Sequence, residues 1–193
     1  MVLAASPGHA SSIASVEEAL KEKVYGDPDA PVTVVEYASL GCPHCANFHL
    51  QTFPELKKTY IDTGKVRLVY KDFPLGRPAF AASMIARCAG HERYFGMIDV
   101  FYKSQANWSR AENPLAELQK VARFGGLSPE GVEACLGTRP LAEGIQKVAK
   151  EAQKIGVNST PSFVIEGRVY PGAMSFEEMK PLIDGALERA GVK

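Results

Sequence analysis

Two cysteines separated by two residues, in the run Cys42-Pro-His-Cys45, are the first feature of the sequence with reactive chemistry. Such a CxxC pair attaches a c-type haem, binds zinc, or alternates between a dithiol and a disulfide. Haem attachment is excluded, because it needs a His directly after the second cysteine, where this chain has Ala46. Zinc is disfavoured, because His49 would add only a third ligand and Cys88 and Cys135 lie apart without neighbouring ligands. The pair is therefore predicted to be redox-active.

The position of the pair favours a low pKa for the thiol of Cys42. A strand is expected directly before the pair and a helix directly after it, so Cys42 lies at a helix N-terminus, where unpaired N–H groups and the helix dipole stabilise a thiolate. Pro43 fits the first helical turn, and His44 can add a donor or a positive charge. An inert buried pair is disfavoured at such a position. Because a stabilised thiolate makes the disulfide more oxidising, the Cys42–Cys45 disulfide is expected to pass readily to a substrate's thiols.

The elements expected around the pair form a βαβ unit. β-branched residues at 32–37 and apolar residues at 66–70 predict two strands, and a helical stretch extends between them from the cysteines to about Asp62. This spacing places the two strands side by side and parallel. Pro54 is expected to kink the helix, because proline removes a backbone donor and clashes with the preceding turn.

The rest of the chain is predicted to add a helical block, a hairpin and a final helix. Apolar residues recur at helical spacing from about 74 to 156, strand residues return in 162–170, and a capping box at Ser175 begins a terminal helix. Another capping box at Ser15 begins a helix of about ten residues, with one apolar face made of Val16, Leu20 and Val24. The expected fold class is α/β, with the order βαβ…ββα and an inserted all-helical domain.

Composition restricts the class of protein. The 193 residues carry 22 Lys and Arg against 22 Asp and Glu, and this zero net charge argues against a dedicated nucleic-acid-binding protein. A bilayer span needs roughly 20 apolar residues and no run approaches that length, so a soluble chain is expected. Residues 1–12 show neither the basic nor the apolar region of a signal peptide. Two interpretations stay open: a cytoplasmic protein, or an exported chain whose leader has been removed.

Three features together resemble the DsbA family of thiol:disulfide oxidoreductases. They are the CPHC motif, the helical block, and the segment Gly156-Val-Asn-Ser-Thr-Pro-Ser-Phe-Val-Ile165, which is followed after the hairpin by Gly172-Ala173. The resemblance covers about residues 26–190 and implies a thioredoxin-like fold with an inserted all-helical domain. The expected organisation is an N-terminal segment with a short helix at 1–25, thioredoxin-like parts at 26–73 and 157–193, and a helical insertion at 74–156.

The resemblance also implies how the protein works. Periplasmic oxidases of this family pass their disulfide to unfolded or partly folded exported proteins with free cysteines, and a quinone-linked, DsbB-like membrane partner reoxidises them. No cofactor or metal is expected, because the dithiol carries both electrons. We therefore expect a monomer located in the bacterial periplasm, with no nucleic-acid partner.

A substrate-binding edge is implied at the later segment. The family's pattern implies a cis bond between Thr160 and Pro161, which would hold the Thr160 backbone beside Cys42, where an extended substrate can pair with it as an added strand. The alternative is a trans proline that only begins a strand.

Glu36 is the candidate for a proton-transfer residue. It lies in an apolar strand six residues before Cys42, and a buried acid is costly unless it is paired or protonated. In thioredoxin-like proteins an acid at this offset is thought to exchange protons with the second cysteine, here Cys45. The alternative is a side chain that points outward from a half-exposed strand. Lys71 is either its partner or a solvated residue at the end of the next strand.

The remaining cysteines, Cys88 and Cys135, both fall in predicted helices. The oxidising compartment that the family implies favours a structural disulfide between them. The alternative is two buried free thiols, because Cys88 continues an apolar stripe through Phe80 and Met84. His49, about one turn after Cys45, is expected to be a surface or packing residue.

Three other functions remain as alternatives. A disulfide isomerase or reductase on the same fold is favoured by Thr160, because threonine before the cis-proline is common in such relatives, but these are often dimers with a longer N-terminal segment. A copper- or zinc-handling protein could use Cys42 and Cys45 as soft ligands. The kappa-class glutathione transferases share the inserted helices but generally lack a CxxC pair.

Overall fold

A five-stranded sheet organises the part of the chain that the computed structural model describes, residues 13–192. Residues 1–12, on which the leader question depends, lie outside it. The strand order is β1-β3-β2-β4-β5, and β2 and β3 are parallel while every other pair is antiparallel. The strands are β1 (Lys23–Tyr25), β2 (Val32–Ala38), β3 (Val66–Asp72), β4 (Ser162–Ile165) and β5 (Arg168–Pro171). The predicted α/β class and the order βαβ…ββα are confirmed.

The N-terminal helix is shorter than predicted. It is α1 (Val16–Leu20), in which Ser15 accepts a hydrogen bond from the Glu18 N–H. Val24 was expected on the apolar face of this helix but lies in β1, where it pairs with Val69. The helix ends early because the chain turns extended at Lys21 and its next residues complete the free edge of β3.

The helix that follows the cysteines accommodates Pro54 by changing its hydrogen-bond pattern. It consists of α2 (Pro43–Asn47), the π-helical η1 (Phe48–Thr52), α3 (Phe53–Leu56) and the π-helical η2 (Lys57–Ile61). Phe53 donates its N–H to Phe48 O, five residues earlier. This wide turn stands directly before Pro54, whose missing donor and ring would disturb an ordinary turn.

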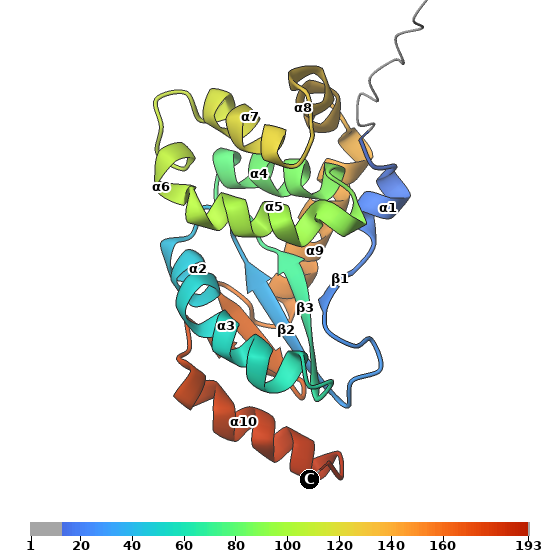
Figure 1. The fold of residues 1–193 in the computed structure, drawn as a ribbon, viewed down its shortest axis with the longest axis vertical. Coiled ribbons are helices and arrows are strands. Elements are labelled where there is room, and N and C mark those ends of the chain that lie inside the picture. The colour runs from blue at the N-terminus through green and yellow to red at the C-terminus, as the bar shows by residue number, and fades with distance from the viewer. Residues whose placement is uncertain (1–12, 193) are drawn as a thin grey trace, which may run out of the picture.

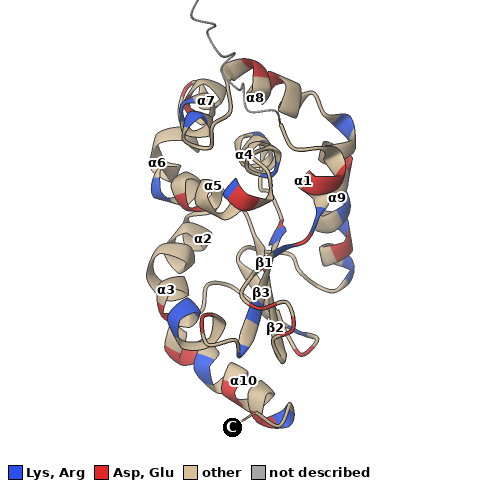
Figure 2. Ribbon diagram, turned by 45° about the vertical axis from the view of Figure 1, so that its right-hand side comes forward, with Lys and Arg blue, Asp and Glu red and all other residues tan. Residues whose placement is uncertain are grey.

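Helices alone connect β3 to β4. They are α4 (Arg77–Cys88), α5 (His91–Lys103), α6 (Gln105–Trp108), α7 (Pro114–Phe124), α8 (Pro129–Leu136) and α9 (Arg139–Lys154). Most of them form a block beyond the ends of β2 and β3, whereas α9 returns along the sheet and α10 (Phe176–Arg189) lies beside α3 at the opposite end (Figure 1). A capping box at Ser175 begins α10, as predicted. Lysine, arginine and acidic residues are dispersed over the outer helices, without a face of a single sign in this view (Figure 2).

Both faces of the sheet are buried, and β2 shows how. Val32, Val34 and Glu36 alternate toward the main core, which includes residues of the helix after the cysteines and of α10. Tyr37, on the other face, belongs to a smaller core with Ala152 from α9. A strand buried on both sides has few positions for polar residues, which explains the nearly continuous apolar run in the sequence.

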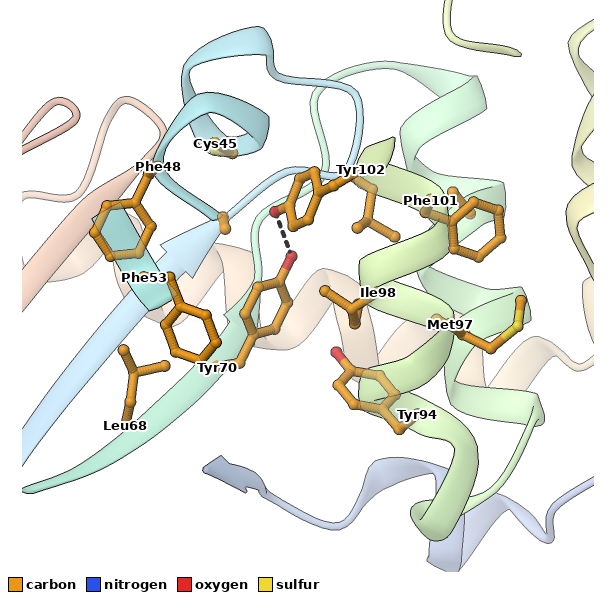
Figure 3. Packing of buried hydrophobic residues seen from close by; sticks show 14 of the residues in the cluster. Cys45, Phe48, Phe53, Leu68, Tyr70, Tyr94, Met97, Ile98, Phe101 and Tyr102 are labelled. Carbon is orange, nitrogen blue, oxygen red and sulfur yellow. Dashed lines mark hydrogen bonds between the residues drawn. The ribbon is translucent and has the colours of Figure 1, made fainter. Parts of the chain in front are cut away.

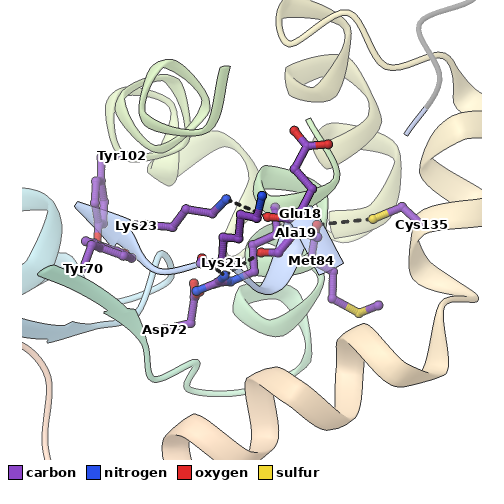
Figure 4. A network of polar contacts seen from close by, with 10 residues as sticks. Glu18, Ala19, Lys21, Lys23, Tyr70, Asp72, Met84, Tyr102 and Cys135 are labelled. Carbon is purple, nitrogen blue, oxygen red and sulfur yellow. Dashed lines mark hydrogen bonds and ion pairs between the residues drawn. The ribbon is translucent and has the colours of Figure 1, made fainter. Parts of the chain in front are cut away.

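One long-range connection joins two helices of the helical block, and another ties the block to the sheet and to the N-terminal segment. Cys88 in α4 and Cys135 in α8 form a disulfide with their Cα atoms 6.1 Å apart. The buried Arg87 donates from Nε to Asp72 Oδ2 at 2.6 Å and from Nη1 to Ala19 O at 2.7 Å. Lys23, Asp72 and the backbone of α1 converge in this network (Figure 4).

Candidate active site

The two cysteines of the CPHC motif occupy unequal positions at the start of α2. Cys42 is the N-cap residue, with extended backbone angles, and its side chain keeps 7% exposure. Cys45 lies in the helix and is completely buried. Both are free thiols in this structure. A substrate can therefore reach Cys42 but not Cys45.

The surroundings of Cys42 favour its thiolate. Its pKa is lowered to about 5, first by a hydrogen bond from the Cys45 thiol and then, against the opposing effect of burial, by Thr160 and by the backbone N–H groups of Cys45 and His44. The last two groups belong to the first turn of α2, where N–H groups have no partner within the helix. His44 contributes here through its backbone, and its side chain is exposed.

The surroundings of Cys45 favour its protonated thiol instead. Burial raises the pKa of its thiol far above the usual range, and the neighbouring Cys42 adds to the effect. At neutral pH the reduced pair therefore consists of a Cys42 thiolate and a protonated Cys45. This asymmetry suits a pair in which one sulfur exchanges with a partner and the other needs help to lose its proton.

Glu36 is near enough to Cys45 to raise the pKa of that thiol, and no opposite charge in the described part of the chain stabilises its own carboxylate. It is 2% exposed, burial raises its pKa to about 8, and its Oε1 atom has no hydrogen-bond partner. The outward-pointing alternative is wrong, and so is the proposed partner Lys71, which lies 3.7 Å from Glu22. Successive residues of a strand face opposite sides, and Lys71 is in register with Tyr37 while Glu36 is in register with Tyr70. Lys71 is therefore on the other face of the sheet.

The loop before β4 reaches Cys42 from the far end of the chain. The Thr160–Pro161 peptide bond is cis, and the Cys42 thiol donates from Sγ to Thr160 O at 3.2 Å. The Oγ1 atom of Thr160 is buried, and the Thr160 side chain also favours the Cys42 thiolate. Gly172 donates its N–H to Pro161 O at 2.9 Å. The antiparallel pairing of β4 with β2 brings this loop to the same end of the sheet as the cysteines.

Aromatic side chains close the site from below. The hydroxyl groups of Tyr70 and Tyr102 are 2.8 Å apart, and Tyr102 lies between the helix that carries Cys45 and β3 (Figure 3). His49 packs among these rings, stacked on Phe53, and burial lowers its pKa to about 4. His49 was expected to be a surface or a packing residue, and it is a buried packing residue.

Two residues that sequence reasoning missed hold the loop between β2 and α2. Ser39 Oγ accepts the N–H groups of Gly41 at 3.3 Å and of Leu75 at 3.1 Å. Gln105, from α6, donates its side-chain amide to Leu40 O and Cys42 O. Ser39 forms a local turn with Gly41, two residues later, which the sequence could have indicated, whereas no local pattern marks Gln105 because it acts across more than sixty positions.

Residues 13–192 contain no cluster of three or more His, Cys, Asp or Glu side chains placed to hold a metal ion. In the same residues no helix has the length and apolar character to cross a bilayer.

The fold and the cysteine pair define a thioredoxin-fold protein with a CxxC site at the start of a helix. A family profile described as Thioredoxin matches residues 18–185. The chain belongs to the thioredoxin family, and its relatives and structural neighbours include proteins named as disulfide oxidoreductases and as DsbA.

Individual relatives agree with this assignment. A Rickettsia conorii protein named "Putative protein-disulfide oxidoreductase" is 37% identical over 172 residues, which are 86% of this chain and 61% of that protein. Disulfide bond formation protein D of Bacillus subtilis is 25% identical over 86% of this chain and 78% of its own. The crystal structure of Wolbachia pipientis alpha-DsbA1 superimposes with a TM-score of 0.81 at 29% identity, covering 88% of this chain and 92% of that one. The chain thus spans about three fifths of the Rickettsia protein's length.

Proposed function

We propose that this protein is a thiol:disulfide oxidase that donates the Cys42–Cys45 disulfide to exported proteins. The observation that carries the proposal is the unequal pair: the pKa of Cys42 is lowered to about 5, whereas burial raises that of Cys45. A reduced form stabilised in this way makes the corresponding disulfide a strong oxidant.

The reaction proceeds by two exchanges. A substrate thiolate attacks Cys42 Sγ, the bond between the two cysteines breaks, and Cys45 leaves with the electron pair. Cys45 then takes up a proton, for which the protonated Glu36 is the buried donor, since its pKa of about 8 keeps it neutral at pH 7. A second substrate thiolate attacks the substrate sulfur of the mixed disulfide, and Cys42 leaves as its stabilised thiolate. Two electrons pass from the substrate to the cysteine pair, and the substrate gains a disulfide.

Substrate binding uses the backbone beside Pro161. Thr160 O already lies at hydrogen-bond distance from Cys42 Sγ, so a chain extended along this loop brings its own cysteine to the same sulfur. Main-chain pairing with such an edge tolerates many sequences, which suits an enzyme acting on unfolded proteins.

The proposed location is the bacterial periplasm, where disulfides persist. The Cys88–Cys135 bond supports it, because structural disulfides are rare in reducing compartments. The proposed reoxidant is a quinone-linked membrane protein of the DsbB kind, and the protein acts as a monomer. Fractionation of the native host, with a blot for the protein in the osmotic-shock fluid, tests the location.

A disulfide isomerase or reductase is the second candidate. Thr160 favours it, since relatives that reduce or isomerise disulfides commonly carry threonine before the cis-proline. An isomerase reactivates scrambled ribonuclease, whereas an oxidase acts on the reduced, unfolded enzyme.

The reduction potential of the pair separates the two candidates. The protein is equilibrated with glutathione buffers, quenched with acid and alkylated to count thiols, with Cys42→Ser as the control that shows which pair titrates. A value toward about −120 mV supports the oxidase, and a value near about −270 mV contradicts it in favour of a reductase.

A further inference from the structure

Gln105 bonds directly to the loop that carries Cys42, although 63 positions separate the two residues. It is the first residue of α6, and its Nε2 donates to Leu40 O at 2.6 Å and to Cys42 O at 3.0 Å. An amide has two such hydrogens, and both are used here. The reversed amide would set Oε1 against two carbonyl oxygens, so the side chain has one orientation.

The two carbonyl groups lie at the entry to α2. Cys42 O also accepts the N–H of Ala46 at 3.1 Å, which is the first hydrogen bond of the helix. The backbone N–H groups that favour the Cys42 thiolate, those of His44 and Cys45, belong to the same first turn. Their direction toward Sγ depends on how the chain enters the helix, and Gln105 holds this entry from outside the α/β part.

Gln105 is itself firmly anchored in the helical block. Trp108, in the same short helix, is fully buried and donates from Nε1 to Phe101 O at 3.0 Å, and its ring packs edge-on against the Phe101 ring. Gln105 is 8% exposed. Gln105 therefore presents both donors to the loop from a buried position in the helical block.

We propose that Gln105 is a positioning residue of the redox site, whose amide holds the Leu40–Cys42 loop so that the first-turn N–H groups of α2 stabilise the Cys42 thiolate. The inference rests on the redox role proposed for Cys42. It makes the helical block part of the apparatus that sets the oxidising strength of the pair.

The test compares Gln105→Met, which keeps the length of the side chain but loses both donors, with Tyr60→Phe, which loses the hydrogen bond from the Tyr60 hydroxyl to Asp184 Oδ1 without touching the loop. The thiolate absorbance of each reduced, full-length protein is titrated against pH. We expect the Cys42 midpoint of Gln105→Met to rise by about half a pH unit or more, the effect of about one lost hydrogen bond. We expect Tyr60→Phe to keep the wild-type midpoint while its melting temperature falls.

The redox equilibrium with glutathione should change together with the Cys42 titration midpoint. At pH 7 the equilibrium constant for oxidising glutathione depends on the same thiolate, so in Gln105→Met it should fall by the same factor, about threefold for half a pH unit. If Gln105→Met has the same Cys42 midpoint as the wild type and only a lowered melting temperature, as in Tyr60→Phe, the inference is overturned. If the Met variant does not fold, Gln105→Asn takes its place, because its amide is one methylene too short, and the same outcomes apply.

The two proposals fail in different ways. A wild-type Cys42 midpoint near that of an ordinary thiol contradicts the proposed oxidase. A low wild-type midpoint that Gln105→Met leaves unchanged contradicts the positioning role alone.

Discussion

The Sγ atom of Cys42 lies 3.2 Å from the carbonyl oxygen of Thr160, although 118 positions separate the two residues. The contact exists because β4 pairs antiparallel with β2 and so delivers the cis-proline loop to the start of α2. A backbone carbonyl accepts a hydrogen bond from a thiol but not from a thiolate. The Thr160 carbonyl is therefore bound to Cys42 in the thiol form and is released to pair with a substrate backbone once Cys42 is ionised or bonded.

The stability of the reduced protein relative to the oxidised protein should depend on pH. The folded pKa of Cys42, about 5, lies below that of an unfolded thiol, so the thiolate contributes stability that rises with pH between these values and is lost as pH falls through 5. We expect the reduced form to gain about 2 kcal/mol relative to the oxidised form between pH 5 and pH 7. Urea unfolding of both forms across this range measures it. A difference independent of pH, with Cys42→Ala as control, would contradict the low pKa.

Removing the thiol of Cys45 should raise the pKa of Cys42. The hydrogen bond from Cys45 is the largest cause of the low value, and Cys45→Ala deletes it, whereas Cys45→Ser keeps a hydroxyl donor. We expect a midpoint higher by about one pH unit in the Ala variant and a smaller change in the Ser variant, measured by thiolate absorbance. Both variants should lose dithiol oxidase turnover completely, because the resolving sulfur is absent. Identical midpoints in the two variants would show that the hydrogen bond is not the cause.

Replacement of Glu36 should remove a pH-dependent cost of folding. Its folded pKa of about 8 exceeds the unfolded value, so the unfolded chain ionises first and stability falls as pH rises from about 4.5 to 8. In Glu36→Gln this fall should disappear, a relative gain of about 3 kcal/mol between pH 4.5 and 7 in chemical unfolding. The variant should also form the mixed disulfide with substrate more slowly, since the departing Cys45 loses its buried proton donor. If the free energies of unfolding of the variant and the wild type change in parallel with pH, a group other than Glu36 is titrating.

Loss of the second disulfide should lower stability without changing the redox site. Cys88 and Cys135 are 47 positions apart, and cross-linking a loop of this length restricts the unfolded chain by about 4 kcal/mol. We expect Cys88→Ala/Cys135→Ala to unfold at lower denaturant concentration by that free energy, with the Cys42 midpoint unchanged. A shifted midpoint would mean that the helical block transmits the change to Cys42. The unreduced wild type should show two fewer alkylatable thiols than wild type in which the Cys88–Cys135 disulfide has been reduced.

The buried ion pair should be the most sensitive polar contact outside the active site. Arg87 binds both Asp72 and the carbonyl of Ala19, and Asp72 is 1% exposed. Asp72→Asn leaves the guanidinium buried without its countercharge, so we expect a loss of about 3–5 kcal/mol in the free energy of unfolding. Lys103→Ala, which removes an exposed pair with Asp99, serves as control and should cost less than about 1 kcal/mol. If Asp72→Asn and Lys103→Ala lower the free energy of unfolding by the same amount, burial of the Arg87–Asp72 pair does not make it more important for stability.

Much of the architecture could be predicted from local patterns. The β-branched run of β2, the capping box of α10 and the helical spacing of the inserted block depend on neighbouring residues, and all of them appear where expected. The placement of the CPHC motif at a helix N-terminus follows from the same patterns. The helix dipole and the first-turn N–H groups lie close to Cys42 because they come from residues within a few positions of it.

Other features depend on contacts between distant segments and leave no local pattern. Lys71 lies on the opposite face from Glu36 because the register of β2 and β3 decides which residues share a face. Val24 pairs with an edge strand instead of extending a helix, since β3 offers unpaired backbone groups there. Amino-acid types and spacing thus determined the chemistry at Cys42, through forces that act within a few residues. The partners that tune this chemistry, Thr160 and Gln105, come from packing, because only the closed sheet and the docked helices bring those atoms within hydrogen-bond range.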